Sequence, residues 1–365
     1  AVLFLVQVPC QPLDRLRHLR EHVLASERLL ERAIAMAEGV RDRTHWQEAS
    51  AVLGMNQLYR GRHTESAETS RKLLSSARTH GDTQGLLWGA PLAACAALRL
   101  DRVDEARAFL EEARSHFDER TAAPDKVNVL GGLALVSFRA DERREALAHA
   151  RAATTTAASI AVNSYWMKHG LGAAIDALLQ LASTEEDVRR VTEMRVALHE
   201  GVRVVRRLAL VFPLARPAAR LWSALLASCE GRRWTAQRAL EKLIDAAGAR
   251  GHRYEEARAM LALVLLHAAL RDARDAFTAA SLLDESAWLA IDAAEGERPD
   301  AELLVLVART LLVEVPAGSW KGHVAWRERA RELLFDLMRV FRETRDPPPP
   351  EETILNALRA VLTAH

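Results

Sequence analysis

Apolar residues recur at helical spacing along almost the whole chain. Between residues 16 and 34, and again between 191 and 208, they fall mainly at steps of three and four, which places them on one face of a helix. The two stripes consist of Leu16, Leu19, Val23, Leu30 and Ile34, and of Val191, Met194, Leu198, Val202, Val205 and Leu208. No stretch alternates between apolar and polar residues over the length of a strand, and the valine-rich run at residues 303–315 is long enough to favour a buried helix. The pattern predicts an all-α fold.

A short motif recurs with a period of 40 residues. In each copy a turn with Gly or Asp opens a helix, acidic residues occupy its first turn, and a small residue follows where two helices would touch. The copies run from Gly61 to Ser66, from Asp101 to Ala106 and from Asp141 to Ala146, and a fourth runs from Gly231 to Ala236. Gly and Asp tolerate the turn, acids favour a helix N-terminus, and a small side chain permits close approach. The alternative is a generic helical bundle in which this spacing is accidental.

The motif resembles the tetratricopeptide repeat, a helix-turn-helix unit of about 34 residues. Leu53 and Gly54 precede Ser66 as the helix A pair of that repeat precedes its small helix B residue, and Ala113 follows Ala106 at the matching distance. The longer period and the missing first-helix aromatics depart from the family pattern, and lengthened helices would account for both. The resemblance implies an α-α superhelix, a solenoid whose concave surface binds a protein or peptide.

The spacing divides the chain into three parts. Residues 1–160 hold the regular repeats, residues 161–345 hold divergent repeats with a long helix at about 184–210, and residues 346–365 hold a proline-rich linker and a capping helix. We interpret residues 1–8 as the end of a buried helix of a longer protein, because the apolar run is too short to span a membrane and has no features of a signal peptide.

Net charge and cysteine content argue against several classes of protein. The formal charge is +1, so no overall field attracts nucleic acid or a membrane. Three widely separated cysteines argue against a disulfide scaffold and favour a reducing compartment, so we expect a cytoplasmic protein.

One motif has catalytic potential. His18 and His22, with Glu21 between them, match the H-x-x-E-H signature of a zinc-dependent hydrolase. Both histidines fall opposite the apolar stripe, no third ligand is evident, and nearby arginines would repel a dication, so a solvated helix face is the stronger interpretation.

The sequence from Gly170 to Gly172 starts like a dinucleotide fingerprint, but Ile175 stands where a glycine or alanine belongs. There is no phosphate-binding loop, so we expect no catalysis, cofactor or metal in this chain.

Arginines and tryptophans stand out among the remaining residues. Arginines are concentrated in one part of the sequence, and nearby acidic residues partly offset their charge. This basic group consists of Arg189, Arg190, Arg195, Arg203, Arg206, Arg207, Arg216 and Arg220. An ion-paired helix surface is its simplest interpretation, with an acidic partner or nucleic acid as the alternative. Trp46, Trp88, Trp166 and Trp222 recur near the predicted first helices, where they would pack between repeats or line a groove for a peptide.

Two longer passages are similar to the C-terminal helical region of bacterial multidomain signalling ATPases. The first extends from Leu53 to Ala106 and includes Gly81, Asp82 and Trp88; the second extends from Val211 to Ala259 and includes Pro213, Trp222 and Gly231. In that family a class III nucleotide cyclase or a Ser/Thr kinase precedes a STAND/AAA-type ATPase and a tetratricopeptide-like tail. The resemblance covers about residues 40–270 and implies a regulatory interaction module. Its partner would be another protein or a preceding catalytic domain of the same polypeptide, and none of the family's catalytic residues falls in this chain.

Overall fold

The chain folds entirely into helices wherever its structure is described. The computed structural model describes residues 15–59, 62–100, 102–185, 187–248 and 253–268, and these residues contain no strand. The α-helices are α1 (Arg15–Gly39), α2 (Arg43–Tyr59), α3 (His63–His80), α4 (Thr83–Arg99), α5 (Val103–Ser115), α6 (Ala123–Arg139), α7 (Arg143–Ala158), α8 (Lys168–Thr184), α9 (Val188–Val211), α10 (Arg216–Cys229), α11 (Arg233–Gly248) and α12 (Arg253–Ala268). Two short 3-10 helices, η2 (Tyr165–Met167) and η3 (Pro213–Ala215), precede α8 and α10. The predicted all-α fold is confirmed.

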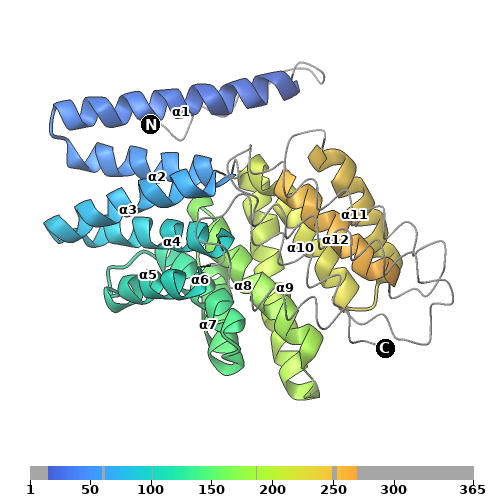
Figure 1. The fold of residues 1–365 in the computed structure, drawn as a ribbon. Helices are drawn as coiled ribbons and strands as arrows, with labels where there is room; N and C mark the ends of the chain where they lie inside the picture. Colours follow the sequence, from blue (N-terminus) through green and yellow to red (C-terminus); the bar gives the residue numbers. More distant parts are fainter. Residues whose placement is uncertain (1–14, 60–61, 101, 186, 249–252, 269–365) are drawn as a thin grey trace, which may run out of the picture.

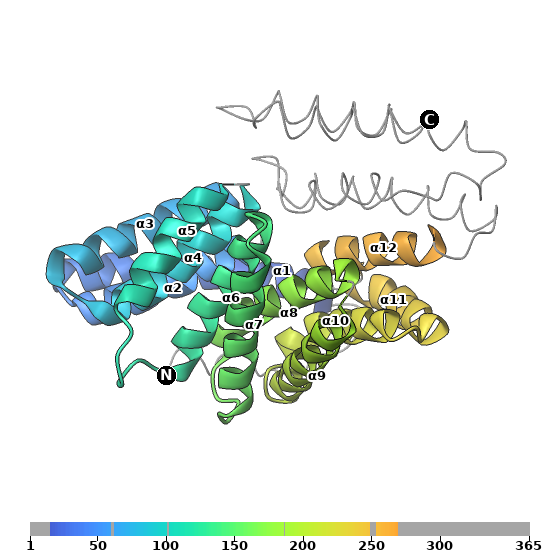
Figure 2. The same cartoon turned by 90° about the horizontal axis from the view of Figure 1, so that it is seen from below.

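The helices are arranged in two layers of an arc. Each helix packs against the next one in the chain, and the even-numbered helices from α2 to α12 also pack against one another in order. These inner helices follow the inside of the arc, while the outer helices α3, α5, α7, α9 and α11 follow its outside (Figure 1). In the view from below, α3 and α5 lie at one end of the described structure and α11 and α12 lie at the other, with α6, α7 and α8 between them (Figure 2). The described residues therefore form a solenoid of helical hairpins.

The predicted 40-residue period is present in the first three hairpins. The inner helices α2, α4 and α6 begin at Arg43, Thr83 and Ala123, 40 residues apart, and the outer helices α3, α5 and α7 keep the same interval. The interval lengthens to 45 residues at α8 and α9. The helix predicted at about residues 184–210 corresponds to α9.

The turns from inner to outer helices share one backbone geometry. An amide at the start of the next helix donates to the carbonyl five residues earlier: Arg102 to Ala97 and Glu142 to Ser137, both at 2.8 Å, and Arg232 to Ala227 at 2.9 Å. The preceding residue is left-handed at Asp141 (φ 60°) and Gly231 (φ 75°). This arrangement is the Schellman motif, which satisfies the last carbonyls of a helix. It is the physical reason for the Gly or Asp that opens the sequence motif.

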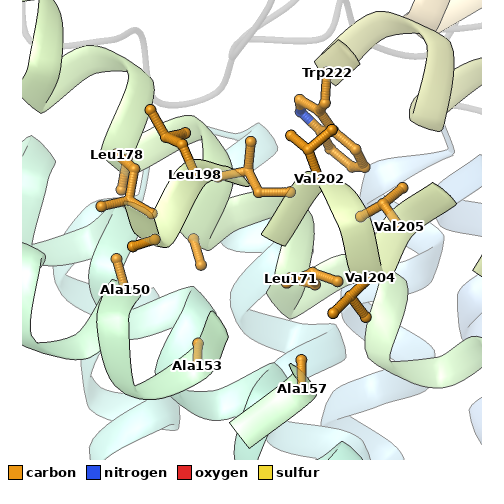
Figure 3. Close-up of a cluster of buried hydrophobic side chains, with 14 of the residues drawn as sticks. Ala150, Ala153, Ala157, Leu171, Leu178, Leu198, Val202, Val204, Val205 and Trp222 are labelled. Carbon is orange, nitrogen blue, oxygen red and sulfur yellow. The ribbon is translucent and has the colours of Figure 1, made fainter. Parts of the chain in front are cut away.

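The largest described core cluster joins the five helices from α6 to α10, and Figure 3 shows part of it. The outer helix α7 contributes the small residues Ala150, Ala153 and Ala157, which are fully buried against the larger side chains of α8 and α9. Small residues on one helix let the partner backbone approach closely, so that leucines and valines fill the space between layers.

Some predictions fall outside the described residues. These include the proline-rich linker and capping helix at residues 346–365, the valine-rich run at 303–315 and the apolar residues 1–8. The boundaries of the three predicted parts stay predictions. Among the helices that the structure describes, none has the length and apolar character needed to cross a bilayer.

Candidate protein-interaction site

The predicted repeat residues lie where inner and outer helices meet. Ser66, Ala106, Ala146 and Ala236 each occupy the fourth position of an outer helix, and none of them is exposed. The Ser66 hydroxyl donates to the Gly54 carbonyl at 2.8 Å, which links α3 to α2. Ala113 and Leu53 are also buried, whereas Gly61 lies outside the described residues. The buried residues of this set pack the hairpins together and offer no surface to a ligand, whereas Gly231 lies exposed in a turn.

Gly170 and Gly172, the glycines that start like a dinucleotide fingerprint, allow α8 to pack closely against its neighbouring helices. A Cβ on Gly170 would lie 2.2 Å from the Cα of Asn128, and a Cβ on Gly131 would lie 1.8 Å from the Gly170 carbonyl oxygen. The backbones of α6 and α8 are therefore in direct contact at this point. The Asn128 side chain also accepts a hydrogen bond from the Gly170 amide at 2.9 Å. Gly172 lies under the Trp222 ring, with a Cβ position 2.5 Å from it. These contacts give the two glycines a packing role.

One stripe of α4 remains partly open on the inside of the arc. From Gly85 to Arg99 every residue of α4 is buried except Trp88, Cys95 and Arg99, which are spaced along one side of the helix. Because the neighbouring helices cover the other sides, this stripe faces the inside of the superhelix. Trp166 of η2 packs into the same cluster as Trp88, although 78 residues separate them in the chain.

Asp125 and His169 are near Trp166, the first through a side-chain interaction and the second as the residue three positions farther along the chain. Asp125, at the start of α6, accepts a hydrogen bond from the side-chain amide of Gln84 at 3.1 Å and interacts with the Trp166 side chain. Burial raises the pKa of the Asp125 carboxyl, in spite of these two partners. Desolvation, reinforced by the positive charges of Lys168 and Arg99, lowers the pKa of His169 to about 3. We call Trp88, Arg99, Asp125, Trp166 and His169 the inner-face cluster.

Buried charges link α8 to α12 farther along the arc. Arg258 of α12 donates two hydrogen bonds to the Asp176 carboxylate of α8, at 2.6 and 2.8 Å. Trp222 of α10 donates its indole N–H to the same carboxylate at 2.9 Å. A second pair, Lys168 and Glu255, lies at 3.5 Å and is also buried. The inner helices of alternate hairpins are therefore tied together in the second half of the described solenoid. The hydrophobic periodicity did not predict these pairs.

Ion pairs also connect successive outer helices. Arg71 of α3 donates to Glu105 of α5 at 2.5 Å, and Arg78 donates to Glu112 with its Nε at 2.7 Å. Farther along, Arg107 of α5 donates to Glu142 at 2.7 Å, and Arg151 of α7 donates to Glu193 of α9 at 3.0 Å. Each such pair on a surface contributes only about 0.2–1 kcal/mol, so the ladder fixes register more than it adds stability.

Some arginines of the basic group predicted from the sequence form ion pairs or hydrogen bonds, and others do not. Among the described residues, Arg190 pairs with Glu185, Arg203 pairs with Glu200 at 3.8 Å, and Arg206 donates to the Ser223 hydroxyl. Exposed arginines with no ion pair to any described residue are Arg189, Arg195, Arg207, Arg216 and Arg220. The ion-paired surface expected from the sequence therefore accounts for part of this group.

The weak metal candidates lie in α1. His18 and His22 belong to that helix by its backbone, but their side chains are outside the described structure. Elsewhere in the described chain no group of three or more His, Cys, Asp or Glu side chains is placed to hold a metal ion. The zinc-hydrolase interpretation stays a prediction.

The hairpins, their period and their buried small residues define a class of protein, the all-helical tetratricopeptide-like repeat proteins. No model of a known family matches the sequence, and no curated protein is similar to it. Among solved structures, the chain is similar to a tetratricopeptide repeat protein from Parabacteroides merdae, with 13% identity over 87% of this chain and 99% of that one, at a TM-score of 0.39. It is also similar to a circular tandem repeat protein with a novel repeat topology, with 16% identity over 94% of this chain and 89% of that one, at a TM-score of 0.25. These scores are low, so the class rests on the helix geometry described above.

Proposed function

We propose that this chain is a protein-interaction module that binds a segment of another protein on its inner face. The observation that carries the proposal is the inner-face cluster, where two tryptophans from distant hairpins remain only partly buried. Aromatic side chains with part of the ring exposed are frequent anchors of protein interfaces. The pKa shifts of Asp125 and His169 both favour the neutral form, which suits contact with an apolar segment.

We further propose that the module is regulatory, as the resemblance to bacterial signalling ATPases implies. Its partner would then be an ATPase, cyclase or kinase domain, either in the same polypeptide or in another protein. This chain would supply no catalysis and bind no nucleotide. Regulation of this kind requires that the module bind one state of the catalytic domain more tightly than the other.

Site-specific photocrosslinking tests the binding face. A benzophenone amino acid is placed at Trp88 on the inner face, and at Ser75, an exposed residue of the outer helix α3, as the matched control. Incubated with lysate of the source cells, the first protein should form one dominant covalent adduct that the second does not. Equal adducts from both positions would refute binding on the inner face.

Calorimetry tests whether the chain binds a nucleotide, and metal analysis tests whether it holds zinc. Titration with Mg-ATP should release no heat of binding, whereas a Kd below about 10 µM would contradict the proposal. Purified protein should contain less than about 0.1 equivalent of zinc, and a full equivalent would favour the hydrolase alternative at His18 and His22.

A further inference from the structure

The end of α9, the η3 turn and the start of α10 form an exposed surface with five arginines. The chain contains no acidic residue between Gly201 and Cys229, yet it contains five arginines there. All five are exposed, and they are Arg203, Arg206, Arg207, Arg216 and Arg220. The hydrogen bond from Arg206 to Ser223 at 2.8 Å brings α9 and α10 side by side, and η3 contacts both helices.

Little in the described structure neutralises this charge. Arg203 has a distant acidic partner in Glu200, at 3.8 Å. Arg207, Arg216 and Arg220 form no ion pair with any described residue. Arginine is well suited to carboxylates because its planar group donates two parallel hydrogen bonds.

Large apolar side chains lie on the same surface. Leu210 is 81% exposed, Val211 is 52% exposed and Leu214 is 47% exposed. They follow one another at the end of α9 and in η3, among the arginines. We call these three residues and the five arginines the α9–α10 basic surface. Exposed aliphatic side chains within a charged rim are a feature of protein interfaces.

We propose that the α9–α10 basic surface binds an acidic amphipathic helix of a partner protein. Its carboxylates would pair with Arg207, Arg216 and Arg220, and its apolar side would cover Leu210 and Leu214. A nucleic acid would satisfy the arginines but would leave the exposed leucine side chains without a partner. A membrane surface would need a broader apolar face with aromatic residues, whereas this surface has three aliphatic side chains at one end.

This surface is separate from the inner-face cluster, with which it shares no residue. The inference therefore goes beyond the proposed function and can fail without it. A partner that used both surfaces would bind more tightly than through either surface alone, because the second contact becomes intramolecular.

A designed peptide tests the proposal. The probe is a fluorescein-labelled helix of about 20 residues with leucines along one side and glutamates elsewhere, and its control carries glutamine in place of glutamate. Fluorescence anisotropy should show binding of the glutamate peptide that weakens with added salt, and much weaker binding of the glutamine peptide. Equal binding of the two peptides would overturn the proposal.

Two sets of variants locate the binding. The triple variant R207E/R216E/R220E should bind the glutamate peptide at least about tenfold more weakly, because it reverses three charges. The matched control R32E/R144E/R238E changes three exposed arginines on α1, α7 and α11 and should stay within about twofold of the parent chain. L210S/L214S should weaken the peptide by about threefold or more, since it removes exposed apolar contact. Circular dichroism spectra must match those of the parent chain.

Competing ligands decide the partner class. If single-stranded DNA of about 20 nucleotides binds more tightly than the peptide and L210S/L214S leaves that binding unchanged, the surface is a nucleic-acid site and the proposal is wrong. Tighter binding to phosphatidylserine vesicles than to the peptide would refute it in the same way. If the peptide does not bind while the Trp88 crosslink still forms, this inference fails and the proposed function stands.

Discussion

At the scale of single residues, backbone conformation explains the turn positions of the repeat. Gly81, between α3 and α4, adopts φ 62°, and its amide donates back to the end of α3. Arg41 and Asp141 adopt nearly the same conformation with a side chain, at φ 59° and 60°. Non-glycine residues reach this region at a cost, so the fold tolerates strain at some turns and avoids it at others.

Substitution of Gly81 by alanine should destabilise the chain. A Cβ at Gly81 would meet no atom within 4 Å, so the expected loss of about 1–2 kcal/mol arises from the left-handed backbone alone. Gly39→Ala is the matched control, because Gly39 also has open space around it but no positive φ. Urea unfolding of both variants measures the difference. A loss in Gly81→Ala no larger than in Gly39→Ala would show that the backbone strain is negligible.

His169 should make stability depend on pH. Its pKa is about 3 in the folded chain and about 6.5 in the unfolded chain, so the unfolded state binds a proton more readily. The stability that the neutral imidazole provides is complete above pH 6.5 and is lost as the pH falls toward 3. Between pH 7 and pH 5 the loss from this residue should be about 2 kcal/mol.

The variant His169→Gln isolates that contribution. It cannot take up a proton, so its free energy of unfolding should change less between pH 7 and pH 5 than that of the parent chain. Urea titrations at the two pH values measure the change. Identical pH dependence of the two proteins would mean that His169 does not titrate between folded and unfolded states.

At the scale of elements, much of the hairpin pattern could be predicted from the sequence. Turn residues, acidic first turns and small buried residues are local features, so a 40-residue period in them predicted where α3, α5 and α7 begin. The contact between α6 and α8 could not be predicted in this way. Gly131 and Gly170 meet where the backbones of two inner helices touch, and neither glycine belongs to the repeating motif.

Gly170→Ala tests the closeness of that contact. Its Cβ would overlap the α6 backbone at 2.2 Å, so α6 and α8 must separate and uncover part of the core; we expect a loss of more than about 3 kcal/mol. Gly54→Ala is the comparison, because its Cβ would make ordinary contacts at 3.4 Å or more, and should cost less than about 1 kcal/mol. Thermal melts followed by circular dichroism rank the two variants. Equal midpoints would refute the backbone contact.

At the scale of the whole described structure, two charged pairs connect the inner helices α8 and α12. Asp176 and Arg258 are 82 residues apart in the chain and meet because α8 and α12 are inner helices of alternate hairpins. The superhelix pitch is the sum of many small rotations between hairpins, so no local pattern could reveal this pair. The inner-face cluster has the same origin, since Trp88 and Trp166 come together across the arc. The sequence pattern predicted that both tryptophans pack between repeats or line a groove, but it did not indicate Asp125 or His169.

Asp176→Ala should loosen the second half of the solenoid while the first half stays folded. The substitution removes the carboxylate that pairs with the largely buried Arg258 guanidinium and accepts from the Trp222 indole, and the loss of these hydrogen bonds should cost about 3 kcal/mol. Because hairpins contact mainly their neighbours, the loss should fall on α8, α10 and α12. Hydrogen exchange measured by mass spectrometry should show faster exchange in α12 and unchanged exchange in α4. Asp176→Asn, which keeps an acceptor for Trp222 but not the charge, should give an intermediate rate. Uniform acceleration along the whole chain would instead mean that the solenoid unfolds as a single unit and that the pair does not act as a local clamp.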